Sequence, residues 1–321
     1  MNKSIALIVG ICGQDGAYLA KLLLSKGYIV HGSTRDASLC NTSNLSKLKI
    51  LDDINLLSLA PNDFRSVIKA VNSIDPDEVY YLAGLTSVGL SFEQPVECME
   101  SISLGTLNFL EAIKLNGKKI KFFNAGSSEC FGNTNKIIAN EKTVFSPRSP
   151  YATAKATAFW MVSNYRESYN LFCCTGILGN HESPLRNKRF VTKKIISGVW
   201  DIVCKNSKEL RLGNLDTWRD WGWAPEYVEA MYLMMHSQQP EDYIIATGVT
   251  NSLKDFVTMA FKKFNLDASA YITCDESLLR PSDIKYSYLD PSKIYKNLNW
   301  KSEKNLENII ESMFEEFVNQ Y

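Results

Sequence analysis

An apolar run at residues 5–9 leads directly into a turn with three glycines, Gly10, Gly13 and Gly16, and this junction constrains the fold more than any other feature. Glycines at this spacing let the backbone turn sharply and approach a pyrophosphate, while the N-terminus of the following helix supplies amide donors. The spacing differs from the G-x-G-x-x-G of typical dehydrogenases. It predicts the first strand and helix of a nucleotide-binding sheet.

Apolar strands and amphipathic helices continue to alternate through the first half of the chain. Strands are predicted at residues 5–9, 28–33, 54–59, 78–82, 121–125 and 172–178, and helices at 16–27, 63–74, 95–116 and 150–169. Strands separated by helices form a parallel sheet that is covered on both faces. The expected fold class is therefore α/β, with a doubly wound parallel Rossmann sheet.

The pattern changes after Gly179, where polar loops rich in arginine weaken the alternation. A helix at 224–236 and a strand at 242–247 are expected to return to the first lobe. We therefore predict a nucleotide-binding domain of residues 1–178 and 222–250, and a smaller, discontinuous α/β lobe of residues 179–221 and 251–321. No Pro/Gly-rich linker separates them.

Charge and composition exclude several classes of protein. The 321 residues include 35 Lys+Arg and 35 Asp+Glu, so there is no basic excess for nucleic acid, and an anionic ligand must meet a local basic cluster. The eight cysteines lack metal-ligand spacing, which predicts reduced thiols in a cytoplasmic protein with no metal site. The N-terminal residues are typical of a strand rather than a signal peptide, and no apolar stretch is long enough to span a bilayer.

Tyr151 and Lys155 stand four residues apart in a predicted helix and so share one face. Ionising a phenol, whose pKa is about 10, near neutrality requires roughly 4 kcal/mol. A cation at about 4 Å supplies roughly that much at an effective dielectric constant near 20, and an oxidised nicotinamide would add a second positive charge. Such pairs are common on solvated helices, but the glycine turn favours a tyrosine base.

Ser127 and Glu129 follow the predicted strand at 121–125, at the edge where open α/β sheets bind ligands. Ser127 can hydrogen-bond a substrate hydroxyl and share its proton with Tyr151. A carboxylate such as Glu129 permits proton abstraction next to a newly formed ketone, the chemistry that elimination needs. The alternative is a loop glutamate that caps a local turn.

Arg35 occupies the end of the second strand, where many NAD enzymes carry an acidic residue. A guanidinium there suits the 2′-phosphate of NADP. NAD remains open because the carboxylate of Asp36 can bind ribose hydroxyls, and in the alternative interpretation Arg35 is only a surface charge. NADP is the favoured cofactor.

Long motifs in both lobes resemble the extended short-chain dehydrogenase/reductase family and, within it, the GDP-mannose 4,6-dehydratases. The resemblance covers nearly the whole chain, and the second-lobe motifs are the most specific to the substrate class. The segments that carry it are 13–19, 127–129, 147–155, 164–167, 180–184 with Arg186, 190–194, 212–216, 219–222, 227–231 and 245–248.

The resemblance implies a reaction that turns GDP-D-mannose into GDP-4-keto-6-deoxy-D-mannose and water, with bound NADP unchanged overall. Its catalytic set is Ser127, Glu129, Tyr151 and Lys155. Tyr151 takes the 4-hydroxyl proton as hydride leaves carbon 4. Glu129 then takes the proton from carbon 5, water leaves carbon 6, and hydride returns to carbon 6.

The resemblance also implies binding residues and a homodimer or homotetramer. Cofactor contacts are implied for Gly10, Ile11, Cys12, Gly13, Gln14, Asp15, Arg35, Asp63, Leu82, Ala83, Gly84, Ser87, Tyr151, Lys155, His181 and Arg186. Nucleotide-sugar contacts are implied for Ser127, Glu129, Asn180, Val191, Lys194, Gly213, Arg219 and Arg280. Arg219 has a structural alternative, an ion pair with Asp220 or another carboxylate.

Some positions depart from the family pattern. Cys12 replaces the usual threonine in the glycine turn, residues 60–63 lack the common Gly-Asp-Leu, and Leu85 and Val88 replace polar residues. The rival interpretations are a GDP-heptose dehydratase, an epimerase or reductase of GDP-sugars on the same scaffold, and a nucleotide sensor without catalysis. Glu129 argues against the epimerase and reductase, and retention of all four catalytic residues argues against the sensor.

Overall fold

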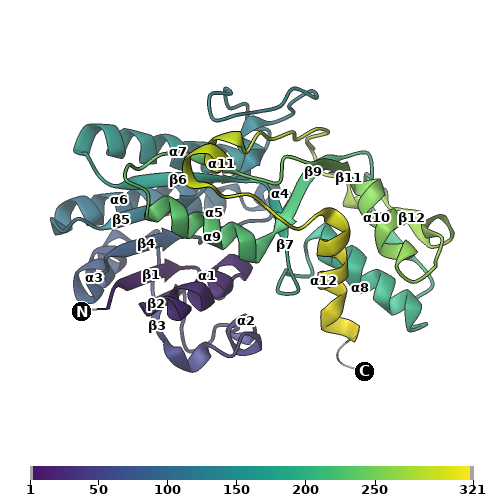
Figure 1. The fold of residues 1–321 in the computed structure, drawn as a ribbon, viewed down its shortest axis with the longest axis horizontal. Coiled ribbons are helices and arrows are strands. Elements are labelled where there is room, and N and C mark those ends of the chain that lie inside the picture. The colour runs from purple at the N-terminus through teal and green to yellow at the C-terminus, as the bar shows by residue number, and fades with distance from the viewer. Residues whose placement is uncertain (1–2, 319–321) are drawn as a thin grey trace.

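Seven parallel strands form the central sheet of the computed structural model, which describes residues 3–318 (Figure 1). Their order is β10-β6-β5-β4-β1-β2-β3, so the chain winds outward in both directions from β1, as a doubly wound sheet does. The predicted strands are all present, which confirms the fold class. Their bounds are β1 Ile5–Val9, β2 Ile29–Thr34, β3 Ile54–Ser58, β4 Glu78–Tyr81, β5 Lys121–Ala125, β6 Cys173–Leu178 and β10 Tyr243–Ile245.

Helices cover both faces of this sheet, which explains why the central strand β1 is apolar throughout. On β1, Ala6 and Ile8 pack into a core with helices α1 and α9, while Leu7 and Val9 point into a second core with α3, α6 and α7. The helices are α1 Gln14–Ser25, α3 Phe64–Ile74, α5 Pro95–Met99, α6 Gly105–Asn116, α7 Pro150–Tyr169 and α9 Ala224–Met235. The single helix predicted at 95–116 is α5, a π-helical segment and α6 in succession.

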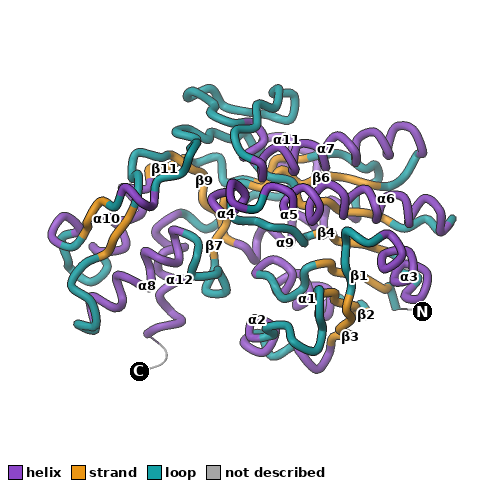
Figure 2. Tube along the Cα trace, turned by 180° about the vertical axis from the view of Figure 1, so that it is seen from behind, coloured by secondary structure: helices purple, strands orange, loops and turns teal. Residues whose placement is uncertain are grey.

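A smaller lobe gathers beside the sheet around its own apolar core, to which Ile195, Trp221, Phe256 and Phe314 contribute (Figures 1 and 2). It contains α8 Val191–Val203, α10 Leu253–Lys262, α12 Leu306–Val318 and the strand pair β8 Leu210–Leu212 and β12 Ile272–Cys274. A three-stranded sheet, β11-β9-β7, joins the lobes through β7 Asn180–Glu182, β9 Trp218–Trp223 and β11 Thr250–Ser252. Short helices α2 Ser43–Lys47, α4 Val88–Glu93 and α11 Ser292–Leu298 complete the chain.

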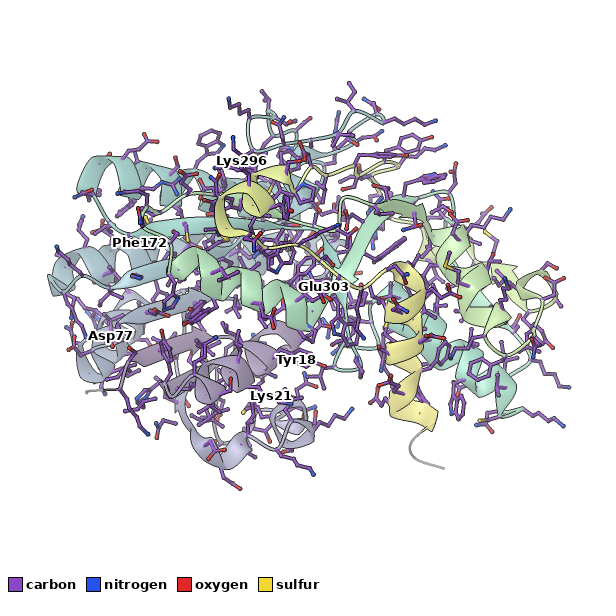
Figure 3. The ribbon with its side chains drawn as sticks, viewed as in Figure 1. Tyr18, Lys21, Asp77, Phe172, Lys296 and Glu303 are labelled. Atoms are coloured by element: carbon purple, nitrogen blue, oxygen red, sulfur yellow. The ribbon has the colours of Figure 1, made fainter. Side chains whose placement is uncertain are left out.

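Polar contacts join α1 and α2 to the smaller lobe. Tyr18 lies at the end of α1 that faces α12 (Figure 3), and its hydroxyl hydrogen-bonds Ser183. Glu316 of α12 pairs with Lys193 of α8 and, at 2.5 Å, with Lys47 of α2. Lys47 thereby holds α2 against the smaller lobe. Within residues 3–318, no helix is long and apolar enough to cross a membrane.

Candidate active site

A cavity of about 600 Å³ lies where the carboxyl ends of the strands meet the smaller lobe. Most of the residues predicted to act on a ligand line it. They are Asp15, Leu82, Ser87, Ser127, Glu129, Tyr151, Lys155, Asn180, His181, Arg186, Val191, Lys194, Gly213, Arg219 and Arg280. The topology thus brings together side chains that are up to 265 positions apart (15 to 280).

The glycine turn is packed too tightly for side chains at two of its glycines. Gly10 has φ +92°, and a Cβ there would lie 3.0 Å from the backbone of Ala83. A Cβ on Gly16 would lie 2.5 Å from the Gly10 oxygen and 2.6 Å from the Ile11 Cα. No side chain caps α1, which begins directly after Gly13, so its first amides remain available to an anion. This cradle fits a pyrophosphate.

Helix α7 positions Tyr151 and Lys155. It begins with Pro150 at a favoured position, and the Ser149 hydroxyl accepts a hydrogen bond from the amide of Ala152 at 3.1 Å. The Lys155 ammonium is buried and donates to the carbonyl of Ala125, at the end of β5, at 2.6 Å. Burial lowers the pKa of Lys155 to about 8.

The expected lowering of the Tyr151 pKa is not produced by these side chains alone. Burial raises that pKa above its ordinary value, and the hydrogen bond from Ser127 only partly opposes the rise. The Lys155 nitrogen lies 5.8 Å from the centre of the Tyr151 ring, since it is directed at the Ala125 carbonyl. Ionisation of the phenol therefore requires further positive charge in the cavity.

Glu129 sits in a 3-10 turn, Ser128–Phe131, that begins directly after the Ser127 cap. The Ser127 hydroxyl accepts a hydrogen bond from the Glu129 amide at 3.3 Å, which aims the carboxyl group into the cavity beside Arg219. Its side chain is 16% exposed, and its carboxyl oxygen lies 3.9 Å from the Arg219 Nε. Burial raises the pKa of Glu129, Arg219 and Arg280 oppose that rise, and Asp283 adds to it.

Sequence patterns did not identify Asp283 as a site residue, although it lies three positions after Arg280, which was predicted to contact the nucleotide sugar. Its carboxylate pairs with Arg219 at 3.3 Å and with Arg280 at 3.6 Å. The alternative considered from the sequence, an ion pair of Arg219 with Asp220 or another carboxylate, holds for Asp283 but not for Asp220, which accepts hydrogen bonds from the amides of Thr247 and Gly248. Arg219 therefore belongs to a charged network that lines the cavity.

A second polar network lies between the glycine turn and the smaller lobe. The His181 Nε2 is 2.9 Å from the Asp15 carboxylate, and its Nδ1 is 2.8 Å from the Gly179 oxygen. Burial alone would lower the pKa of His181, but Asp15 outweighs it and raises that pKa, while the pKa of Asp15 falls to about 2. The guanidinium of Arg186 stacks 3.8 Å from the Phe190 ring centre and pairs with Glu182 at 3.2 Å.

Other predicted residues lie outside the cavity lining. Gly10 to Gln14 form the turn beside it. After β4, Ala83 lies against Gly10 of that turn, while Gly84 packs against Ile102. The Arg35 side chain is 83% exposed and pairs with Glu97 at 3.2 Å. Asp63 caps α3 by accepting a hydrogen bond from the Arg65 amide at 3.0 Å. Arg35 and Asp63 therefore do not line the cavity.

Comparison with solved structures supports the same architecture. A UDP-glucose 4-epimerase of Thermus thermophilus, in complex with NAD, superposes with a TM-score of 0.85 at 23% identity, covering 99% of this chain and 100% of that one. The dTDP-glucose 4,6-dehydratase of Bacillus anthracis, also with NAD, gives a TM-score of 0.85 at 15% identity, covering 98% and 97%. At these identities the likeness concerns the fold alone.

Comparison of sequences is more specific. A family model described as GDP-mannose 4,6 dehydratase matches residues 7–313. GDP-mannose 4,6 dehydratase 2 of Arabidopsis thaliana is 40% identical, covering 98% of this chain and 87% of the relative. A GDP-mannose 4,6-dehydratase of Vibrio cholerae is 38% identical, covering 98% and 93%. The chain therefore belongs to the GDP-mannose 4,6-dehydratase family.

Proposed function

We propose that this chain is a hydro-lyase that converts GDP-D-mannose into GDP-4-keto-6-deoxy-D-mannose and water. The observation that carries the proposal is that Glu129 lines the same cavity as Tyr151 and Lys155. A tyrosine and lysine alone serve oxidation and reduction, whereas a largely buried carboxyl group with a raised pKa provides an acid/base for elimination. The relatives named as GDP-mannose 4,6-dehydratases support the choice of sugar.

A nicotinamide cofactor fits the turn formed by Gly10 to Asp15, with its pyrophosphate at the N-terminus of α1. A nicotinamide bound there would supply the hydride acceptor for the oxidation at carbon 4 and the hydride donor for the reduction at carbon 6. Arg35, directly after β2, favours NADP, because an exposed guanidinium at this position suits a 2′-phosphate. Leu82, Ser87, His181 and Arg186 would line the remainder of the cofactor site.

Within this site, Tyr151 accepts the proton of the sugar 4-hydroxyl, with the Ser127 hydroxyl beside it. Lys155 keeps a positive charge behind the phenol and is itself held by Ala125. Glu129 then removes the proton from carbon 5 and donates a proton to the hydroxyl that leaves carbon 6. A carboxyl group with a raised pKa suits both transfers, because it holds and releases a proton closer to neutral pH.

The nucleotide diphosphate fits the basic side of the cavity. Arg219 and Arg280 supply guanidinium groups there, and Lys194 lines the same wall. On this proposal, the ranges 1–178 and 222–250 hold the cofactor, while 179–221 and 251–321 hold the nucleotide sugar. Asn180, Val191 and Gly213 complete that second group of contacts.

The proposed assembly is a homodimer or homotetramer in the cytoplasm. Two large apolar side chains of the first lobe are exposed, Val96 at 68% and Trp160 at 61%. They belong to α5 and α7, which pack against each other. All eight cysteines are free thiols, as a reducing compartment favours.

The direct test is to incubate the purified chain with NADP and GDP-mannose and follow the nucleotide sugar by mass spectrometry. A dehydratase removes one water, about 18 Da, without net use of cofactor, whereas an epimerase leaves the mass unchanged and a sensor leaves the sugar intact. A parallel incubation with a GDP-heptose measures the sugar preference. Unchanged GDP-mannose in the presence of bound NADP would contradict the proposal.

A further inference from the structure

Two cysteines from separate segments meet at the glycine turn. Cys12 lies in the turn itself and Cys40 lies between β2 and α2, yet their sulfur atoms are only 3.9 Å apart. Both side chains are partly exposed, whereas Cys98, Cys130 and Cys173 are buried. The reaction proposed above uses neither thiol. The proximity of the pair therefore calls for a separate explanation.

The surrounding contacts hold the Cys40 segment against the turn. The Asn44 side-chain amide donates to the Cys12 carbonyl at 3.1 Å, and the Cys40 thiol donates to the Ala37 carbonyl at 3.5 Å. Leu45 is fully buried in the core of the first lobe, and Lys47 pairs with Glu316. The thiols are thus kept near each other by contacts on both sides of Cys40 rather than by chance overlap of two free loops.

We propose that Cys12 and Cys40 form an oxidisable dithiol site, which a peroxide closes to a disulfide that weakens dinucleotide binding at the same turn. A disulfide requires the sulfurs to approach to about 2.05 Å, so they must close by roughly 2 Å. Rotation of the Cys40 side chain and a small shift of its exposed segment supply part of that movement. The glycine turn supplies the rest, and this disturbs it because its backbone is anchored by the Gly10 amide, which is bonded to Ser33 at 3.1 Å.

The chemistry balances with a hydroperoxide as the oxidant. The sulfur of Cys40 attacks the peroxide oxygen, the O–O bond breaks, and Cys40 becomes a sulfenic acid as water or an alcohol leaves. The sulfur of Cys12 then displaces the sulfenic oxygen as water, forming the S–S bond. The two thiols together lose two protons and two electrons, and the peroxide is reduced. A dithiol reductant reverses the change.

Cys40 is the thiol that reacts first in this sequence. Burial and the neighbouring Cys40 raise the pKa of Cys12 to about 12, so Cys12 is seldom a thiolate and is a slow first nucleophile. Its role is to resolve the sulfenic acid that forms 3.9 Å away. A resolving thiol at that distance captures the intermediate before a second peroxide reaches it.

The effect on the cofactor follows from the position of Cys12 between Gly10 and Gly13. Amides in this turn have to face the pyrophosphate, and a covalent link that draws Cys12 toward Cys40 moves them. By linkage, if the disulfide weakens NADP binding tenfold, bound NADP disfavours the disulfide tenfold. For this two-electron couple, tenfold corresponds to a difference of about 30 mV in reduction potential. This part of the inference rests on the proposed function.

The experiment uses the full chain, fully reduced and then treated with hydrogen peroxide with or without NADP. Remaining thiols are alkylated and the peptides are mapped by mass spectrometry. We expect a Cys12–Cys40 cross-link that dithiothreitol removes, an NADP dissociation constant raised at least tenfold, and slower cross-linking when NADP is already bound. Cys40→Ser should abolish the peroxide effect while the reduced variant keeps its basal activity.

The matched control is Cys274→Ser, which removes an exposed thiol on β12 and should leave the cross-link intact. Oxidation of Cys274 without any Cys12–Cys40 cross-link in the wild-type chain would overturn the dithiol site. A cross-linked chain that binds NADP as tightly as the reduced one would overturn its effect on the cofactor. Failure of the reduced chain to dehydrate GDP-mannose would count against the proposed function only, because the peptide map reads the S–S bond directly.

Discussion

The two sides of the cavity are held in place by different means. On the cofactor side the backbone sets the geometry, through the glycine turn and the bond from Lys155 to the carbonyl of Ala125. On the sugar side, ion pairs set it, with Asp283 between Arg219 and Arg280, and Glu129 next to Arg219. A backbone cradle tolerates little change, whereas an ion-pair network can exchange its internal carboxylate for the phosphates of a ligand.

Glu129→Gln should have the largest effect on catalysis. The amide keeps the shape of the side chain but cannot take up the carbon-5 proton, so we expect dehydration to fall about 100- to 10,000-fold while NADP binding stays unchanged. The measurement is the rate of water loss from GDP-mannose, with NADP affinity determined by titration. The control is Glu93→Gln, which alters an exposed carboxylate at the same cavity. Near-normal dehydration by Glu129→Gln would refute its role.

Gly16→Ala should damage the cofactor side. The added Cβ would lie 2.5 Å from the backbone oxygen of Gly10, so the turn must shift, and we expect a loss of about 1–3 kcal/mol in the free energy of unfolding together with weaker NADP binding. Gly13→Ala is the control with a milder expected effect, since its Cβ would lie 3.3 Å from the same oxygen. Denaturant unfolding and NADP titration measure both. Equal stability of Gly16→Ala and the wild type would show that the turn is not rigid.

The pH dependence tests Lys155. Because its pKa is lowered to about 8, the ammonium predominates below that pH and is lost above it. We expect kcat/KM, which reports the free enzyme, to fall about tenfold for each further pH unit. Lys155→Arg, whose guanidinium stays charged, should have lower activity without this alkaline decline. If kcat/KM of the wild type stayed level well above pH 8, catalysis would not depend on the charged ammonium of Lys155.

Asp283→Asn should shift the acidic limb of the same profile. The Asp283 charge raises the pKa of Glu129, so its removal should lower that pKa and keep Glu129 ionised to a lower pH. We expect the acidic limb of kcat/KM to move to lower pH, and KM for GDP-mannose to change by less than about tenfold. The control is Asp290→Asn, which exchanges a carboxylate that accepts a hydrogen bond from the Ser292 amide at 2.9 Å. Movement of the limb to higher pH would contradict the assigned coupling.

Arg35→Ala should have the smallest effect and a selective one. Loss of a charge-assisted hydrogen bond to the 2′-phosphate should weaken NADP about tenfold and leave NAD almost unchanged. Glu97→Gln removes the present partner of Arg35 but keeps the guanidinium, so it should not weaken NADP. Paired titrations with both cofactors give the result. Equal losses for NADP and NAD would show that Arg35 does not read the 2′-phosphate.

Much of the first lobe was predictable from the chain. The strands at residues 5–9 and 121–125 match β1 and β5 at both ends, and the helix at 150–169 matches α7, because strand and helix periods, Pro150 and the glycine stop signals are all local. The predicted start of α1 at residue 16 lies two residues late, since Gly13 rather than Gly16 precedes the first helical residue. The gathering of the proposed catalytic residues at one edge follows from parallel strands.

The electrostatics of the cavity were not predictable in the same way. The sequence places Lys155 four residues from Tyr151, but only the folded chain shows that the ammonium meets the Ala125 carbonyl and that burial raises the Tyr151 pKa. Burial and charge depend on every neighbour in space, and spacing along one helix contains no information about them.

The sequence by itself determined the doubly wound sheet, the glycine turn and the membership of Ser127, Glu129, Tyr151 and Lys155 in one site, because periodicity, turn chemistry and strand polarity are properties of short segments. Only the tertiary structure decided the pairing of Asp283 with two arginines and the meeting of Cys12 with Cys40. Those contacts join loops of different elements, and their closeness depends on how the two lobes and the segment before α2 pack together.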